Sequence, residues 1–589
     1  MFPEAILIVL LLLEGVACKS PNILFILSDD TGWNDVSFHG SNQIPTPAMD
    51  ELASTGITLN NYYVNPVCSP TRASIMSGRS MIHHGIQTPF SHGNDASGLN
   101  LSYTLFPEQL KKHYNYSTYM VGKWHLGMKT KAYLPSSRGF DKFYGFYLGA
   151  SDYWKHYSDV DDNGEPGLDL HQGGIELNLK PGEDEPVYSS ASQYSTTLYA
   201  NKAIEWIGDH ARERPHVPWY MYLAFQGTHS SNNKFLQAPA HKIEDFDYIS
   251  PNETCGQYDV CSTTPTCTKR AMRKTCAATL AVVDDAIRDI VEQLKSVDMY
   301  ENTIIIYSSD NGGPADGVDN NMMNNYPLRS GKGSTWEGGI RAAGFIHAPY
   351  ILKRTGVSND LFHVSDWYKS LFKASAGGGV PKRISLKPAE VPWKQGDGID
   401  NWDMLASSEA EKVPSARTEI IIAAQASGSI HETNAIRVKD MKLLWAPNLL
   451  YDSKLWYYPP GSEKYNYTVK CGKPPDNISG NSCENADNPC LYNISADPCE
   501  HHNLAFKMPE LVAKLKAKIA EYSKTTIFPW KQYSQSDERA LPSNHGGKVK
   551  IVPNKFKGGP SEYNGIWTPW LNTKESAGYY PENYTGPGY

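Results

Sequence analysis

The residues with the clearest capacity for chemistry surround Cys68. The sequence Cys68-Ser69-Pro70-Thr71-Arg72 places a cysteine four positions before an arginine, with a proline midway between them. The ordinary alternative is a cysteine of a secreted protein that pairs in a disulfide. Which role Cys68 has therefore depends on the groups that the fold brings to it.

Two pairs of residues could bind a metal ion. Asp29-Asp30 and Asp310-Asn311 each follow a short apolar run, and carboxylate and amide oxygens are ligands of hard divalent cations. Each pair alone is more typical of a turn or a helix cap. Two such pairs at the ends of two strands, together with the Cys68 motif, favour a metal site.

Four apolar runs are predicted to position these residues. They cover residues 22–27, 119–122, 219–225 and 303–307, and they end next to Asp29-Asp30, Lys123, His229 and Asp310-Asn311. Continuous apolar runs rich in β-branched residues are typical of strands buried on both faces, as in a mostly parallel sheet. Apolar residues at helical spacing over 280–294, and a second helix predicted over 194–207, alternate with the strands.

This alternation of strands and helices predicts an α/β sandwich. Ligands of such sheets bind at the carboxyl ends of the strands, so the four polar endings should meet at one rim.

The sequence changes in character after about residue 375. Short alternating segments at 419–423, 434–438 and 441–445 predict an antiparallel sheet with one exposed face, and residues 507–522 predict a terminal helix. Since one hydrophobic core rarely exceeds about 250–300 residues, at least two domains are expected. The predicted divisions are a signal peptide at 1–18, a main domain at 19–400, a smaller α+β domain at 401–540 and a tail at 541–589.

The sequence resembles the type I sulfatases. The Cys68 motif matches the family's Cys-x-Pro-x-Arg signature, and five further segments match in the family's order, at residues 25–35, 121–127, 138–141, 309–313 and 336–339. Pro327-Leu328-Arg329 followed by Lys332, and the segment 363–367, are most similar to the arylsulfatase B (N-acetylgalactosamine-4-sulfatase) branch. The resemblance implies an alkaline-phosphatase-like sandwich with a large, mostly parallel or mixed sheet.

The resemblance also implies the cofactors. Cys68 would be oxidised by the formylglycine-generating enzyme during secretion to 3-oxoalanine (formylglycine), whose hydrate is the nucleophile. Calcium would be held by an oxygen of residue 68 together with Asp29, Asp30, Asp310 and Asn311.

The family further implies the roles of the cationic residues. Arg72 would fix the hydrate in place, while Lys123, His125, His229 and Lys332 would surround the sulfate. His229 or Lys332 would supply the proton to the leaving alcohol, and His125 would deprotonate the second hydroxyl of the hydrate so that sulfate is released.

Four of these positions have weaker support from the sequence. Lys123 and His125 lie on either side of Trp124, so a strand would place both side chains on one face, as a site requires. Two residues at the edge of a sheet could share a face in this way without forming a site. His229 is followed by Ser230-Ser231, where the family often has a proline two residues later, so this loop is reshaped. Lys332 stands between two glycines and could instead be a solvated loop lysine.

Several features indicate the secretory pathway, leading to a secreted or lysosomal protein. A short apolar stretch over residues 5–13 with small residues after it is typical of a signal peptide. No later segment has the roughly 20 apolar residues of a membrane anchor, so no stable anchor is expected. Seven glycosylation sequons agree with this route, at Asn100, Asn115, Asn252, Asn466, Asn477, Asn493 and Asn583.

The remaining cysteines predict disulfides. Without Cys18 and Cys68, eight of the ten cysteines remain, in two clusters, Cys255/Cys261/Cys267/Cys276 and Cys471/Cys483/Cys490/Cys499. An oxidising compartment favours four disulfides, and the spacings lack the short Cys-x-x-Cys pattern of zinc sites.

The net charge argues against some classes of partner, and several functions remain as hypotheses. A net charge of −8 argues against nucleic acid as a partner and requires local positive charge for any anionic substrate. The leading prediction is a calcium-dependent sulfatase that acts on small sulfate monoesters, with 4-sulfated N-acetylgalactosamine or a glucosinolate as narrower alternatives. A phosphatase or phosphodiesterase of the same superfamily, and a non-catalytic binder of sulfated ligands, are the other two hypotheses.

Overall fold

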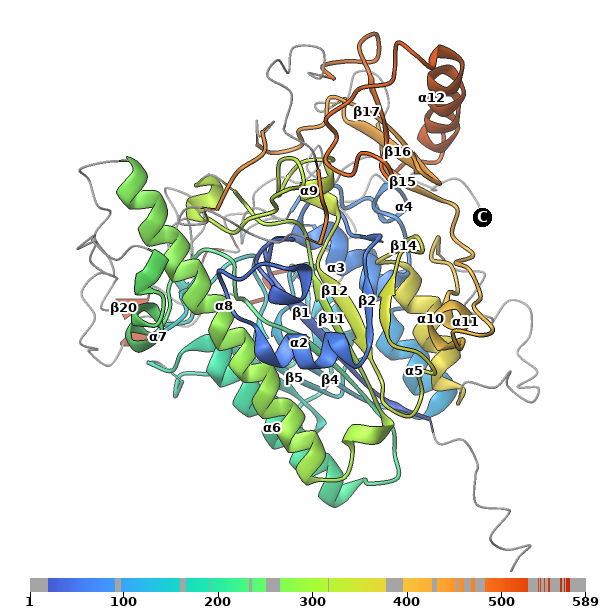
Figure 1. The fold of residues 1–589 in the computed structure, drawn as a ribbon. Coiled ribbons are helices and arrows are strands. Elements are labelled where there is room, and N and C mark those ends of the chain that lie inside the picture. The colour runs from blue at the N-terminus through green and yellow to red at the C-terminus, as the bar shows by residue number, and fades with distance from the viewer. Residues whose placement is uncertain are drawn as a thin grey trace, which may run out of the picture.

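The computed structural model describes most of the chain between Ser20 and Leu571 (Figure 1). Up to residue 527 the exceptions are 90–96, 159–165, 191, 232–235, 250–264, 316, 378–395, 426–431, 452–454, 460–467 and 472–482. Beyond 527 it describes residues 539, 541, 545, 549–550, 562–563, 566 and 568–571. The predicted signal peptide, the sequons at Asn252, Asn466, Asn477 and Asn583, and most of the tail lie outside the described residues.

A ten-stranded sheet forms the centre of the larger part of the molecule. Its strand order is β13-β2-β12-β11-β1-β10-β4-β5-β8-β9. The five strands β11, β1, β10, β4 and β5 run parallel, and β12 and β8 flank them in antiparallel orientation. In the same order, the strands are Gly356–Ser358, Ile57–Leu59, Gly344–His347, Thr303–Ser309, Asn22–Ser28, Trp219–Ala224, Ser117–Lys123, Lys142–Phe146, His171–Gly174 and Glu185–Pro186.

Helices cover both faces of this sheet (Figure 1). Alternate residues of β1 point to opposite faces. Leu24 and Ile26 pack in a core with helices α2 (Pro47–Ser54), α6 (Ser195–Glu213) and α8 (Pro265–Ser296). Phe25 and Leu27 pack on the other face with α3 (Cys68–Ser77), α5 (Phe106–Tyr114) and α10 (Asp366–Ser375). The central strands are therefore buried on both faces, as their continuous apolar sequences predict.

A second, four-stranded antiparallel sheet follows in the C-terminal part. Its order is β15 (Glu419–Ala424), β16 (Asn434–Val438), β17 (Met441–Trp445) and β18 (Cys490–Asn493). Helix α12 (Pro509–Ser523) packs on one face through Val512, Leu515 and Ile519. The predicted fold class, a sandwich with a mixed sheet and a smaller antiparallel α+β part, is confirmed. The exact domain boundaries stay predictions.

A buried ion cluster joins the two sheets. Lys442 of β17 donates to Glu337 Oε1 at 2.9 Å and to Glu500 Oε1 at 2.8 Å, and all three side chains are 0% exposed. Glu337 begins the short helix α9 (Glu337–Ile340), which lies in the chain between strands β11 and β12 of the main sheet. The cluster therefore ties the C-terminal sheet to the loop region above the main sheet.

The remaining elements are short. The helices are α4 (Met81–His84), α7 (Ala240–Glu244) and α11 (Trp402–Ala406), and the two-stranded ladders pair β3 (Tyr62–Tyr63) with β14 (Phe362–His363), β6 (Tyr157–Ser158) with β7 (Gly167–Leu168), and β19 (Val549–Lys550) with β20 (Glu562–Tyr563). The 3₁₀ turns are Ser37–His39, Lys131–Tyr133, Pro135–Ser137, Ile175–Leu177, Asp247–Ile249, Tyr300–Asn302 and η7 (Val318–Asn320). Within the described ranges, no helix combines the length and apolar character needed to cross a membrane.

Candidate functional site

The predicted rim exists at the carboxyl ends of four adjacent parallel strands. Asp29 and Asp30 directly follow β1, Asp310 and Asn311 directly follow β11, and Lys123 is the last residue of β4. His229 lies in the loop after β10. Because β11, β1, β10 and β4 are neighbours in the sheet, these polar residues converge from four separate stretches of sequence.

Cys68 is the first residue of α3 and points into this rim. Its side chain is buried, and its Sγ lies within 4.8 Å of a carboxylate oxygen of both Asp29 and Asp310. Burial raises the pKa of the Cys68 thiol to about 11. The structure records Cys68 as a free cysteine, so the disulfide alternative is excluded in this structure.

Arg72 lies one helical turn after Cys68, on the same face of α3. Its Nε and Nη2 donate to Asp310 Oδ2 at 3.2 and 2.8 Å, and its Nη1 donates to the carbonyl of Lys123 at 3.0 Å. The four-residue spacing of the motif therefore places the guanidinium beside the cysteine and fixes the Asp310 carboxylate.

Lys123 neutralises Asp29. Its Nζ donates to Asp29 Oδ2 at 2.5 Å, and both side chains are fully buried. Burial alone would raise the pKa of Asp29, but Lys123, His229 and Arg72 outweigh it and hold the pKa below the ordinary value. Burial raises the pKa of Asp310 to about 7, with a further contribution from Asp29 that Arg72 partly offsets.

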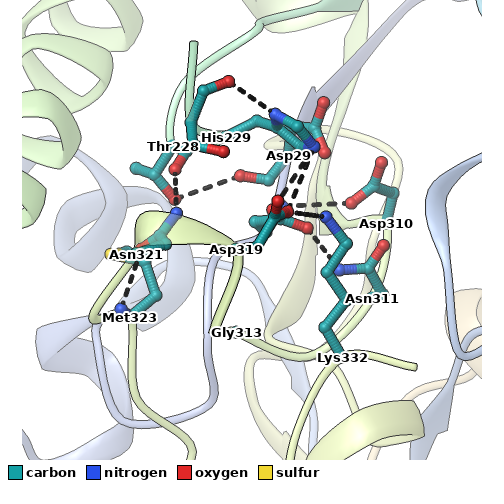
Figure 2. A network of polar contacts seen from close by, with 12 residues as sticks. Asp29, Thr228, His229, Asp310, Asn311, Gly313, Asp319, Asn321, Met323 and Lys332 are labelled. Atoms are coloured by element: carbon teal, nitrogen blue, oxygen red, sulfur yellow. Dashed lines mark hydrogen bonds and ion pairs between the residues drawn. The ribbon is translucent and has the colours of Figure 1, made fainter. Parts of the chain in front are cut away.

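Figure 2 shows the polar contacts on the other side of the site. Lys332 Nζ donates to Asp30 Oδ2 and to Asp319 Oδ2, each at 2.8 Å. His229 Nε2 lies 3.7 Å from Asp30 Oδ2 and 3.6 Å from Asp319 Oδ2. Lys332 is 5% exposed, so it is not a solvated loop residue. The structure therefore brings Lys332 and His229 together across two carboxylates.

Steric constraints explain why glycines flank Lys332. Gly333 has a φ of +78°, and a Cβ on Gly331 would come within 2.3 Å of the Gly313 carbonyl oxygen. A larger residue at either position would be strained or would collide with backbone. The backbone of Gly333 also pairs with Leu449, which anchors this loop to the C-terminal part of the chain.

The donor set fits a hard divalent cation. Asp29 Oδ1 and Asn311 Oδ1 are buried, and neither has a hydrogen-bond partner within the part of the chain that the structure describes. Asn311 Nδ2 donates to Asp30 Oδ1 at 2.7 Å, which turns the amide oxygen away from that carboxylate. Buried oxygens without a donor are costly, and a cation with oxygen ligands would satisfy both of them. The residues present therefore match the predicted metal site.

His125 is buried just after β4, but strand alternation does not position it as the sequence predicted. Strand β4 ends at Lys123, and His125 has a φ of +54°, so strand alternation does not set its direction. Its backbone N–H donates to the carbonyl of Tyr147, and its ring packs against Gly149, where a Cβ would approach within 2.8 Å.

Two residues near the site were missed by the sequence analysis. Asp319 lies in the 3₁₀ turn η7, within a loop without a motif, and contacts Lys332 only because the loop folds back. Tyr451 comes from the C-terminal part and packs against Gly333. Burial raises the pKa of Tyr451 to about 12, while Lys332 lowers it. No motif or spacing in the sequence connects Asp319 or Tyr451 to the site.

The cysteine prediction is partly wrong. Two disulfides form in the second cluster, Cys471–Cys499 and Cys483–Cys490. Cys276 is a buried free thiol in α8, so the expected pairing of all eight cysteines fails. Helix α8 holds it against the Asn321 side chain and the Met322 backbone. Cys255 and Cys261 lie outside the described residues, and so does the side chain of Cys267.

Comparisons with known proteins agree with this geometry. The family profile described as Sulfatase matches residues 21–377. The chain is 33% identical over 572 residues to arylsulfatase J of Mus musculus, covering 94% of this chain and 80% of the relative. It is 25% identical over 508 residues to N-acetylgalactosamine-6-sulfatase of Homo sapiens, covering 84% of this chain and 83% of the relative.

Solved structures show the same fold. The structure of Ps i-CgsB has 25% sequence identity and a TM-score of 0.59, covering 86% of this chain and 93% of its own. PsFucS1 sulfatase from Pseudoalteromonas sp. has 24% identity and a TM-score of 0.60, covering 87% and 93%.

Proposed function

The chain belongs to the sulfatase family and is a sulfuric ester hydrolase, and from this premise we propose that it cleaves small sulfate monoesters with a formylglycine derived from Cys68 and a calcium ion. The position of Cys68 carries the proposal. Within the described part of the chain, Cys68 is buried among charged side chains rather than beside another cysteine. Its Sγ lies within 4.8 Å of carboxylate oxygens of Asp29 and Asp310, and Arg72 follows one helical turn later.

The thiol itself is a poor candidate for the nucleophile. The thiolate is the reactive form of cysteine, and burial raises the pKa of Cys68 to about 11, so the thiol stays protonated near neutral pH. Oxidation to formylglycine removes this difficulty. When formed, the aldehyde hydrate supplies one hydroxyl that attacks sulfur and a second hydroxyl whose deprotonation releases inorganic sulfate.

The acidic residues of the rim would hold the calcium ion. Asp29, Asp30, Asp310 and Asn311 would contribute oxygen ligands, together with an oxygen of formylglycine 68. When bound, the ion supplies positive charge that favours ionisation of a nearby hydroxyl and neutralises a sulfate oxygen. Lys123 holds the pKa of Asp29 low and keeps it ionised, and Arg72 orients the Asp310 carboxylate. Arg72 would also orient residue 68.

The cationic side chains would bind sulfate and move protons. Burial would lower the pKa of Lys332, but Asp30 and Asp319 raise it well above the ordinary value, so Lys332 stays cationic as a sulfate-binding group. His229, whose Nε2 lies 3.7 Å from Asp30 Oδ2, or Lys332 is proposed as the proton donor to the leaving alcohol. His125 is proposed as the base that acts on the second hydroxyl.

The substrate is proposed as a class. Relatives named arylsulfatase and N-acetylgalactosamine-6-sulfatase support a sulfate monoester of an aryl or carbohydrate alcohol. The arylsulfatase B-like activity on 4-sulfated N-acetylgalactosamine, and activity on a glucosinolate, are narrower proposals within this class.

Maturation in the secretory pathway is part of the same proposal. The two disulfides support an oxidising compartment, where the formylglycine-generating enzyme would meet the chain. The predicted signal peptide would deliver the chain there, with a secreted or lysosomal destination.

The proposed activity is tested with matched substrates and variants. Purified protein from a secretory host is assayed with 4-nitrophenyl sulfate and 4-nitrophenyl phosphate, a sulfated N-acetylgalactosamine and a glucosinolate. We expect the sulfate ester to be cleaved far faster than the phosphate, and Cys68→Ala to abolish cleavage while the melting temperature is retained. Cys276→Ala removes a buried thiol away from the rim and serves as the control, with activity retained. Faster cleavage of the phosphate, or an active Cys68→Ala variant, would overturn the proposal.

A further inference from the structure

The carboxylate of Asp319 lies among the groups proposed to bind sulfate. Its Oδ2 accepts a hydrogen bond from Lys332 Nζ at 2.8 Å and lies 3.6 Å from His229 Nε2 (Figure 2). Lys332 also contacts Asp30 and His229 approaches Asp30, so Asp319 lies on the outer side of the same lysine and histidine. It brings negative charge to a place where an anionic ester must bind.

The loop around Asp319 is built to hold this position. Gly317, Asp319 and Asn320 have φ values of +88°, +56° and +49°, so the chain makes an unusual left-handed turn there. The Asp319 side chain is 18% exposed, whereas Asp30 is fully buried. Asp319 therefore contacts the buried Lys332 and also lies on the accessible side of the site, where the alcohol portion of a substrate would lie.

A carboxylate at this place discriminates between neighbouring groups on a substrate. It accepts hydrogen bonds from hydroxyl or amide N–H groups and repels a second anion. Repulsion inside a poorly hydrated site is stronger than in bulk water. When the sulfate contacts Lys332 and His229, the substrate group next to the ester would lie beside the Asp319 carboxylate.

We propose that Asp319 is a specificity-determining residue that favours sulfate esters with a hydroxyl beside the sulfate and disfavours those with a second anionic group beside it. This inference rests on the proposed function, since it uses Lys332 and His229 as sulfate-binding groups. The contrasting role is a counter-ion that only neutralises Lys332. A counter-ion would affect all sulfate esters alike, whereas a specificity residue changes their ratio.

The test uses three aryl sulfates that differ beside the ester. They are 2-hydroxy-5-nitrophenyl sulfate, 4-nitrophenyl sulfate and 2-carboxyphenyl sulfate. Comparing each substrate between wild type and Asp319→Asn cancels differences in leaving-group reactivity. Asparagine preserves the size of the side chain and tolerates a positive φ, so the turn is retained.

We expect Asp319→Asn to raise kcat/KM for the carboxyphenyl ester about tenfold relative to 4-nitrophenyl sulfate, and to lower it about threefold for the hydroxyl ester. Two controls should leave the three-substrate ratio unchanged. Val318→Ala alters the same turn and keeps the charge, and Asp289→Asn removes one charge from the exposed face of α8.

Binding provides a second readout that does not need turnover. The same three esters are titrated by calorimetry into Cys68→Ala protein with and without Asp319→Asn, and the ratio of Kd values should shift in the same direction. Equal changes for all three esters, or none, would overturn this inference. Failure of wild type with formylglycine at residue 68 to cleave any of the three would contradict the proposed function, and the Kd ratio would still decide the role of Asp319.

Discussion

Replacing Lys442 should destabilise the protein through the two carboxylates that it leaves behind. Lys442 donates to Glu337 and Glu500 at 2.9 and 2.8 Å, and all three side chains are 0% exposed. Removing one partner of a buried ion pair costs about 3–5 kcal/mol, because an uncompensated charge remains in the interior. We therefore expect Lys442→Met to lower the free energy of unfolding by about 3–5 kcal/mol at pH 8.

The pKa shifts give this penalty a pH dependence. Burial, offset by Lys442 and reinforced by Glu337, raises the pKa of Glu500 from 4.5 to about 7. When the pKa of a carboxyl is higher in the folded than in the unfolded state, the free energy of unfolding falls as pH rises from the unfolded-state pKa through the folded-state pKa. Burial alone would raise the pKa of Glu337 too, but Lys442, Arg341 and Arg437 hold it below the ordinary value. Without Lys442 both carboxyls protonate more readily, so the penalty should be smaller at pH 5 than at pH 8.

Denaturant unfolding of the variants separates this account from simple loss of packing. Glu500→Gln keeps the pair of Lys442 and Glu337 and should cost about 1 kcal/mol or less. Combining it with Lys442→Met should recover part of the Lys442→Met loss, because one buried charge is removed. A Lys442→Met penalty below about 1 kcal/mol, or one equal to that of Glu500→Gln at both pH values, would refute the reasoning.

Two further predictions concern the metal site and the disulfides. A chelator should lower the melting temperature, and calcium at 100 times its Kd should raise the free energy of unfolding by about 2.7 kcal/mol. Asp310→Asn should abolish this response, whereas Asp289→Asn should keep it. A melting temperature that is insensitive to chelator and calcium would count against the site. Opening Cys471–Cys499, with a sequence separation of 28, should cost about 3.6 kcal/mol in denaturant unfolding, against about 2.4 kcal/mol for Cys483–Cys490, with a separation of 7. The reverse order would contradict the loop-entropy argument.

The central strands could be predicted from the sequence because their burial on two faces requires continuous apolar residues. Predicted residues 22–27 and 303–307 correspond to β1, Asn22–Ser28, and β11, Thr303–Ser309. The predicted helix 194–207 ends later, at Glu213. Short strands such as β13, Gly356–Ser358, were not predicted because they bury little surface and carry no apolar run.

The site was predictable where chemistry and strand ends coincide. Asp29 and Asp310 follow buried strands, so a parallel sheet alone brings them together. Asp319 could not be predicted in this way, because its place depends on the three-dimensional path of a loop. Cys276 was expected to pair since counting cysteines ignores burial, and α8 holds it inside the core.

The same limit applies to the buried ion cluster. Glu337, Lys442 and Glu500 are separated by 105 and 58 residues, and each charged residue alone is typical of a solvated surface. Only the docking of the C-terminal sheet shows that they neutralise one another.

The chemical state of residue 68 in active protein tests the central claim most directly. Mass spectrometry of the peptide that contains it, after purification from a secretory host and alkylation in denaturant, distinguishes an aldehyde from a thiol. We predict the mass of formylglycine at residue 68, in a fraction that rises in proportion to the sulfatase activity of different preparations, while Cys276 in the same sample is alkylated as a thiol. Fully active protein with an alkylated thiol at Cys68 would contradict the account.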